Sequence, residues 1–154
     1  MQARMANPVM TVPGLLPALQ SVSALTNKSG VAKTTLYLIT LRASQINGCG
    51  FCVDMHSREL KEAGERDERI WAVGAWREST LFTEAERAAL ALTEAATRIA
   101  DRPDPVSDEV WAEAARHYDE PKLATLVLNI AMINFWNRVN GPIRQPVGQV
   151  KGAA

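Results

Sequence analysis

The stretch from Leu123 to Trp136 is the most apolar part of the sequence, and it constrains the fold more than any other feature. It is shorter than the ~20 residues that a membrane-spanning helix needs, and Asn129 and Asn134 interrupt it. Its apolar side chains would surround a helix almost completely. We therefore expect a helix that is central in the fold or covered by a second subunit, and no membrane association.

Signals for the start and end of helices divide the rest of the chain. The clearest is Thr83 followed by Glu86, a capping box in which each residue satisfies a backbone amide of the other. No segment shows the alternation typical of a strand. We expect an all-α fold of six or seven helices, with the main ones at about 31–46, 49–63, 67–76, 83–100, 107–118 and 119–139.

Composition limits the class of protein. The 17 basic and 17 acidic side chains cancel, which argues against a nucleic-acid-binding protein. We expect one domain over residues 1–154, with a less regular segment at 1–30 and a loosely ordered tail at 144–154. The first residues do not resemble a signal peptide, so the expected location is cytoplasmic. Thiols are usually kept reduced there, and two cysteines are too few to staple a small secreted fold.

The two cysteines lie three positions apart, as Cys49-Gly-Phe-Cys52, directly after an Asn47-Gly48 break. This placement predicts that both sulfurs lie on one face of the first turn of a helix. The free amides and the positive end of the helix dipole favour a thiolate there. His56 follows one turn later on the same face, where an imidazole could accept or return a proton.

Four interpretations of this strip of side chains compete. A dithiol redox centre uses both sulfurs and the imidazole. A structural zinc site needs four ligands, whereas the strip offers three and the only other histidine, His117, is distant in sequence. Covalent haem attachment needs a histidine directly after the second cysteine, where this chain has Val53. Two buried structural thiols beside a chance histidine form the fourth interpretation.

The wider sequence resembles a known superfamily. The segment from Leu41 to His56 contains the CxxCxxxH pattern of alkylhydroperoxidase D-like proteins, which belong with the carboxymuconolactone decarboxylases. Similar motifs follow in the same order at 75–78, 83–94 and 133–138, so the resemblance extends over roughly residues 35–140. It implies an all-helical protein that forms homo-oligomers, trimers or hexamers.

The resemblance also implies an activity and residue roles. Redox-active members reduce hydroperoxides, so Cys52 would attack the peroxide, Cys49 would close the disulfide and His56 would relay protons. A dithiol donor, either a lipoyl group or a thioredoxin-like protein, would then reopen the disulfide. This chemistry requires no metal, haem or flavin cofactor.

One position departs from the family pattern. The peroxidase members carry a glutamate twelve residues before the first cysteine, and this chain has Tyr37 there. A phenol, with an ordinary pKa near ~10, is a poor proton acceptor at neutral pH. Tyr37 could instead orient His56 through a hydrogen bond, donate a proton to an alkoxide or simply pack as an aromatic side chain.

Two other functions are open on the sequence alone. The chain could be a redox-sensing or partner-binding oligomer without turnover, in which the disulfide alters an interface. It could also be a lyase of the carboxymuconolactone decarboxylase type. Members with that activity do not need a cysteine pair, so the cysteines favour the redox function.

Overall fold

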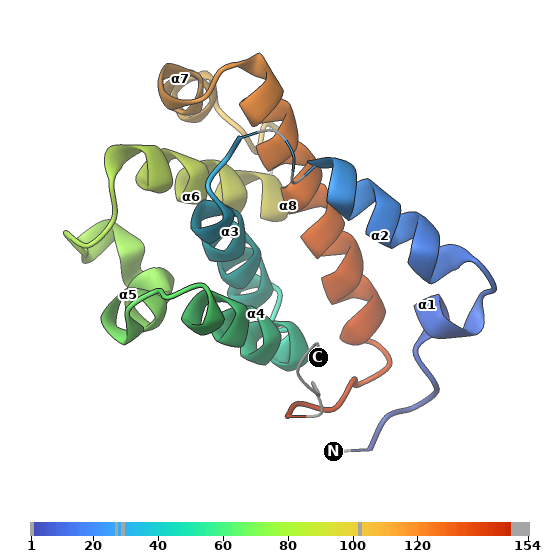
Figure 1. The fold of residues 1–154 in the computed structure, drawn as a ribbon. Coiled ribbons are helices and arrows are strands. Elements are labelled where there is room, and N and C mark those ends of the chain that lie inside the picture. The colour runs from blue at the N-terminus through green and yellow to red at the C-terminus, as the bar shows by residue number, and fades with distance from the viewer. Residues whose placement is uncertain (1, 27, 29, 102, 149–154) are drawn as a thin grey trace.

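The computed structural model describes residues 2–26, 28, 30–101 and 103–148. Helices account for all the regular structure in these residues, which confirms the expected all-α fold (Figure 1). The elements are α1 (Pro8–Thr11), α2 (Leu15–Thr26), α3 (Lys33–Ile46), α4 (Gly50–Glu62), α5 (Asp67–Ala72), the 3₁₀ helix η1 (Val73–Glu78), α6 (Glu84–Thr97), α7 (Asp108–His117) and α8 (Glu120–Asn140).

Helix starts agree well with the sequence signals. Thr83 and Glu86 form the expected capping box at α6. The side chains of Ser107 and Asp119 accept backbone amide hydrogens at the starts of α7 and α8. Each such cap replaces hydrogen bonds that the first turn of a helix cannot make internally, so these starts are determined locally.

Other boundaries differ from expectation. The helix expected from Asp67 to Trp76 is two elements, because the backbone of Ala75 leaves helical geometry (φ −123°, ψ 32°) and Val73–Glu78 is a 3₁₀ helix. Helix α5 begins at Asp67, with Arg66 as its N-cap. The helix expected over 83–100 stops earlier, since α6 ends at Thr97, and Ile99 is 60% exposed.

The N-terminal segment is more regular than expected. It contains two helices, α1 and α2, where a less regular segment is expected. Val9 of α1 is buried, whereas α2 has no buried residue and lies along the outside of α8 (Figure 1). Within the expected loose tail, residues 145–148 contain no helix, and residues 149–154 lie outside the described part of the chain.

Helix α3 occupies the centre and packs against α4 on one side and against α6 and α8 on the other (Figure 1). Two hydrophobic clusters meet along it. The first joins α3, α6, α7 and α8 through Val31, Leu36, Ile39, Ala89, Leu92, Ala114, Tyr118, Leu123, Leu126 and Ile130. The second joins α3, α4, η1 and α6 through Leu38, Leu41, Leu60, Val73, Trp76, Phe82 and Leu90.

Helix α8 is only partly enclosed. Leu126, Ile130 and Ile133 face the core, whereas Leu128 and Phe135 are 51% and 38% exposed. One face of α8 is therefore central in the fold, as expected, and the other face is exposed in this single chain. None of the helices in the described residues is long and apolar enough to cross a membrane.

A buried carboxylate, Glu94 of α6, ties the second cluster together. Its Oε1 accepts from Arg42 Nε (2.7 Å) and Trp76 Nε1 (2.9 Å), and its Oε2 accepts from Arg77 and Arg98. Burial alone raises the pKa of Glu94, but the hydrogen bonds from Arg77, Trp76 and Arg42 outweigh it and lower the pKa to about 2. Glu94 is therefore a permanently charged link between α3, η1 and α6 at neutral pH.

Candidate redox site

The site begins at the turn between α3 and α4. Gly48 has φ 66°, a left-handed conformation that glycine adopts without strain, and this allows the chain to reverse direction directly after α3. The amide of Cys49 then donates to Ser44 O at 3.0 Å. Cys49 becomes the N-cap of α4 and Cys52 its third residue, so the sequence prediction of two sulfurs at a helix start is correct in placement.

The two cysteines form a disulfide in this structure. Cys49 is 4% exposed and Cys52 is fully buried. They pack with Ala43 of α3 and Ile133 of α8 in a small third cluster. The disulfide is therefore held at the junction of three helices, α3, α4 and α8.

His56 lies one turn after Cys52 on α4 and is 7% exposed. Its Nδ1 is 2.7 Å from Oε2 of Glu59, the residue three positions later. In the neutral ring this contact places the proton on Nδ1 and leaves a free lone pair on Nε2. Nε2 is buried and has no hydrogen-bond partner among the described residues, which makes it available to a substrate or to a thiol.

Tyr37 of α3 lies in the same cavity wall as His56 but is not hydrogen-bonded to it in the described structure. Glu59 lines this cavity as well. The ammonium of Lys33 lies over the Tyr37 ring, 5.3 Å from its centroid. Hydrogen bonding to the phenol raises the pKa of Lys33 above its ordinary value. Glu59, rather than Tyr37, orients the imidazole.

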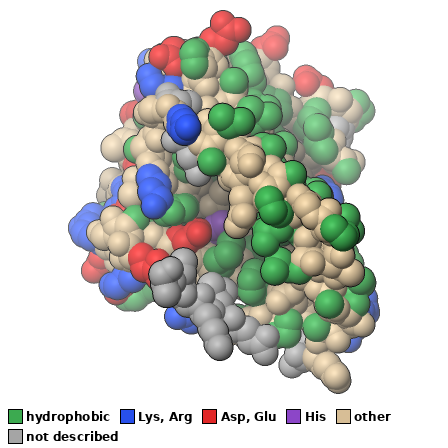
Figure 2. Space-filling view, turned by 45° about the vertical axis from the view of Figure 1, so that its right-hand side comes forward, with side chains coloured by type: hydrophobic (Ala, Val, Ile, Leu, Met, Phe, Trp, Pro, Cys, Tyr) green, Lys and Arg blue, Asp and Glu red, His purple; other side chains and the backbone are tan. Residues whose placement is uncertain are grey.

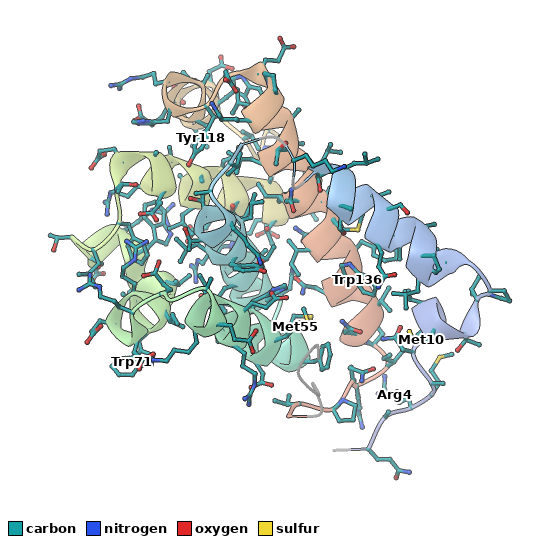
Figure 3. The ribbon with its side chains drawn as sticks, viewed as in Figure 1. Arg4, Met10, Met55, Trp71, Tyr118 and Trp136 are labelled. Atoms are coloured by element: carbon teal, nitrogen blue, oxygen red, sulfur yellow. A yellow bond between two sulfur atoms is a disulfide. The ribbon has the colours of Figure 1, made fainter. Side chains whose placement is uncertain are left out.

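A cavity of about 370 Å³ lies beside the disulfide, between α1, α2, α3, α4 and α8. Figure 2 shows the molecule hollowed on this face, with a histidine visible inside and hydrophobic side chains along the rim. Met55 of α4 and Trp136 of α8 both line this cavity (Figure 3). The walls are mainly apolar and include Val9, Met10, Leu16, Leu36, Tyr37, Phe51, Met55, Met132, Ile133 and Trp136.

The polar part of the lining is small: Asn7, Ser23, Thr40, His56, Glu59, Asn129 and Asn140. Neither cysteine belongs to the lining, although Phe51 and His56 flank Cys52 on the same helix. Asn140 connects the cavity to the disulfide, because it lines the cavity and its Nδ2 donates to Cys52 Sγ at 3.5 Å. No group of three or more His, Cys, Asp or Glu side chains suited to a metal ion occurs in the described residues.

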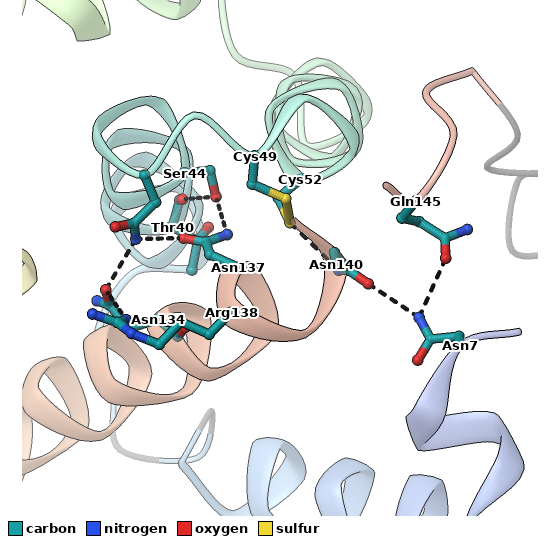
Figure 4. Close-up of a disulfide and its surroundings, with 11 residues drawn as sticks. Asn7, Thr40, Ser44, Cys49, Cys52, Asn134, Asn137, Arg138, Asn140 and Gln145 are labelled. Atoms are coloured by element: carbon teal, nitrogen blue, oxygen red, sulfur yellow. Dashed lines mark hydrogen bonds between the residues drawn. A yellow bond between two sulfur atoms is a disulfide. The ribbon is translucent and has the colours of Figure 1, made fainter. Parts of the chain in front are cut away.

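A network of side-chain amides holds the turn before Cys49 against α8 (Figure 4). Asn47 Nδ2 donates to Oδ1 of Asn134 (2.9 Å) and of Asn137 (2.8 Å). Asn137 in turn donates to Ser44 Oγ at 3.1 Å. Asn134, Asn137 and Ser44 are buried, and these bonds join them to the exposed Asn47, so the start of α4 is fixed relative to α8.

Four aromatic side chains, Trp71, Trp76, Phe135 and Trp136, lie in different surroundings in the structure. Trp136 lines the cavity, whereas Trp76 is buried beside Glu94. Trp71 is 74% exposed and points away from the body of the molecule (Figure 3), and Phe135 is also exposed. Only one of the four therefore contributes to the cavity.

Three site residues were missed in the sequence. Glu59 could have been found, because a carboxylate three residues after His56 lies on the same helical face. Asn140 and Asn7 carry no local signal. They reach the site from the far end of α8 and from the residue before α1.

Comparisons with known proteins place this site in a family. The sequence profile described as "Carboxymuconolactone decarboxylase family" matches residues 13–95. The uncharacterized protein YdfG of Bacillus subtilis is 42% identical over 115 residues, covering 75% of this chain and 77% of that protein. A crystal structure of an Agrobacterium tumefaciens protein of unknown function superimposes with a TM-score of 0.86 at 33% identity, covering 95% of this chain and 98% of that one.

A relative with a named activity is matched over a shorter region. The alkyl hydroperoxide reductase AhpD of a Methylobacterium species is 45% identical over 56 residues, which is 36% of this chain and 31% of that protein. The chain thus spans about a third of that reductase. The family profile covers more than half of the chain, and YdfG is similar over most of both lengths. The protein therefore belongs to the carboxymuconolactone decarboxylase family.

Proposed function

We propose that this protein is a dithiol oxidoreductase that reduces organic hydroperoxides through Cys49 and Cys52. The observation that carries the proposal is the disulfide at the start of α4 beside an apolar cavity lined by His56, whose Nε2 is unpartnered. The short match to an alkyl hydroperoxide reductase supports the same reaction class.

The reaction begins from the reduced pair. His56 Nε2 accepts the Cys52 thiol proton, and the thiolate attacks the outer oxygen of a hydroperoxide ROOH. The O–O bond breaks, the sulfur becomes a sulfenic acid, and the RO⁻ fragment leaves as an alcohol with the proton from His56. Glu59 stabilises the imidazolium that exists between these two proton transfers, because its carboxylate contacts Nδ1.

The second half-reaction produces the bond seen in this structure. The Cys49 thiolate attacks Cys52 Sγ, the S–O bond breaks, and the hydroxyl leaves as water after taking a proton. An external dithiol then exchanges with the disulfide, which returns both cysteines to thiols and oxidises the donor. A lipoyl group or a thioredoxin-like protein has the required chemistry. A reducing compartment such as the cytoplasm fits this cycle.

The cavity favours an organic substrate over hydrogen peroxide. Its volume of about 370 Å³ falls in the range of small-molecule sites, ~300–1,000 Å³. Leu36, Met55, Ile133 and Trp136 would bury the organic group of a hydroperoxide, and hydrogen peroxide has no such group.

The homo-oligomer implied by the sequence resemblance is also proposed. Val127, Leu128 and Phe135 form an exposed apolar strip on α8, and a second copy would bury it. Light scattering of the purified protein gives its molar mass in solution, and we expect that of a trimer or hexamer. A monomer mass would contradict the proposal.

The test is a comparison of cumene hydroperoxide with hydrogen peroxide, with dihydrolipoamide as the donor. We expect faster consumption of the organic peroxide and loss of activity in Cys52→Ser. In Cys49→Ser, a sulfenic-acid reagent should label Cys52 after one equivalent of peroxide. Wild-type rates in Cys52→Ser would refute the proposal, and a label on no cysteine of Cys49→Ser would refute the assigned roles.

A further inference from the structure

Asn140 holds an unusual place between the cavity and the sulfur. It is the last residue of α8, it is 4% exposed, and it lines the cavity. Its Nδ2 donates to Cys52 Sγ at 3.5 Å, and no other acceptor for this nitrogen is present in the described residues (Figure 4). A neutral amide donor is thus aimed at the atom that would attack the peroxide.

The orientation of this amide is fixed from outside α8, by Asn7. The backbone amide of Val9 donates to Asn7 Oδ1 at 3.0 Å, so the opposite corner of the Asn7 side chain must be its nitrogen. That nitrogen donates to Asn140 Oδ1 at 3.0 Å and to Gln145 Oε1 at 3.4 Å. Because the oxygen of Asn140 is used in this way, its nitrogen is the atom that faces Cys52.

Two cationic side chains near Cys52 are bonded to other groups, since Arg42 of α3 contacts Glu94 and Arg138 of α8 contacts Asn134. His56 of α4 contacts Glu59 through Nδ1, and its Nε2 has no partner in the described residues. A sulfur anion at Cys52 therefore has the imidazolium that took its proton, the start of α4 and the Asn140 amide to stabilise it. A hydrogen bond to an anion is stronger than one to a neutral thiol, so the amide favours the thiolate.

We propose that Asn140 is a catalytic residue that stabilises the Cys52 thiolate, and that Asn7 is a positioning residue that keeps the Asn140 nitrogen turned toward the sulfur. This inference rests on the proposed use of Cys52 as a nucleophile. It gives the N-terminal segment a role in the reaction, since Asn7 is the N-cap of α1 and also orients Asn140.

The experiment uses Cys49→Ser as the parent, so that Cys52 is the only thiol in the chain. The thiolate fraction is measured by its ultraviolet absorbance over a pH series, together with the rate of alkylation by iodoacetamide at about pH 7. Neither readout requires peroxide turnover.

Asn7→Asp is the decisive variant. Aspartate can still accept the Val9 amide and cap α1, but it cannot donate to Asn140 Oδ1. Its carboxylate instead attracts the Asn140 nitrogen and turns the oxygen toward Cys52. We expect the thiolate fraction and the alkylation rate to fall about tenfold, as for the loss of a hydrogen bond to a charged group. Asn140→Asp should lose at least as much, because a carboxylate repels the thiolate.

Gln145→Ala is the matched control, since it removes the other acceptor of Asn7 and leaves the bond between Asn7 and Asn140 in place. We expect parental alkylation from it. Parental alkylation in a folded Asn7→Asp protein, checked by circular dichroism, would overturn the positioning role, and the same result in Asn140→Asp would overturn the thiolate role. If wild type fails to reduce peroxides while Asn7→Asp still slows alkylation, the proposed function fails, and the effect of Asn140 and Asn7 on the Cys52 thiolate stands.

Discussion

Two buried polar centres, one around Glu94 and one around His56, are built from similar groups but differ in how completely their atoms are paired. Each oxygen of Glu94 accepts two hydrogen bonds, from Arg42 and Trp76 on one side and Arg77 and Arg98 on the other. His56 is bonded through Nδ1 to Glu59, while Nε2 has no partner in the described residues.

The difference separates a structural centre from a chemical one. A fully paired buried carboxylate has no atom left for a ligand, and its disruption costs stability. A buried nitrogen without a partner is unfavourable for folding and available for proton transfer. Substitutions at the Glu94 centre should therefore change stability, and substitutions at the His56 centre should change the rate.

The largest expected effect is on the rate. His56→Gln removes the group that carries the proton, and we expect peroxide consumption to fall by ~100–1,000-fold. The midpoint of chemical denaturation, measured on the same samples, should move little. A rate within tenfold of wild type would mean that His56 does not relay the proton.

The second effect is on stability. Glu94→Gln leaves three arginines without their buried anion, and we expect the free energy of unfolding to fall by about 3 kcal/mol. Urea denaturation measures this, and the rate of the folded protein should stay near that of wild type. A Glu94→Gln protein of unchanged stability would contradict the contrast between the two centres.

Glu94 also gives a pH dependence with a defined sign. Its pKa falls from an ordinary value of 4.5 to about 2 on folding. The unfolded chain therefore binds the proton first, so the stabilisation is complete above about pH 4.5 and is lost as the pH falls toward 2. Wild-type stability should decline across this window, and that part of the decline should be missing in Glu94→Gln.

A smaller effect is expected at Glu59. Glu59→Gln keeps the size of the side chain but removes the charge that stabilises the imidazolium, so the rate should drop about tenfold. Glu59→Asp should recover part of this loss, whereas a merely structural residue would show no such difference between the two variants. Equal rates for Glu59→Gln and wild type would exclude Glu59 from the relay.

The smallest effect is expected at Tyr37. Its hydroxyl is not hydrogen-bonded to His56, so Tyr37→Phe should retain the wild-type rate within about twofold, a difference below ~0.5 kcal/mol. A large loss would show that the phenol donates a proton to the substrate. Steady-state kinetics with cumene hydroperoxide would distinguish the two results.

Much of the fold could be predicted because its signals are local. The caps at Thr83, Ser107 and Asp119 each act within three residues, so they are readable in the sequence. The break at Ala75 is not, since it depends on how Trp76 packs and bonds to Glu94. Helix α2 was also missed, because Pro13 and Pro17 suggested a less regular segment and the helix contributes no residue to the core.

The candidate site likewise contains residues that the sequence predicts and residues that it does not. Cys49, Cys52 and His56 lie within two turns of one helix, so their spacing alone brings them together. Asn140 reaches Cys52 across 88 positions, and Asn7 reaches Asn140 across 133. Such contacts depend on the packing of α8 against α4 and of the segment before α1 against the end of α8, which no local pattern in the sequence specifies.

The disulfide has a consequence for how long the protein can work. It joins an N-cap to the third residue of the same helix, so it links no two distant segments. A cross-link restricts the unfolded chain less when the loop it closes is shorter, and this loop is among the shortest that a disulfide can close. The reduced and the disulfide-bonded protein should therefore be almost equally stable, so repeated oxidation and reduction should not destabilise the fold.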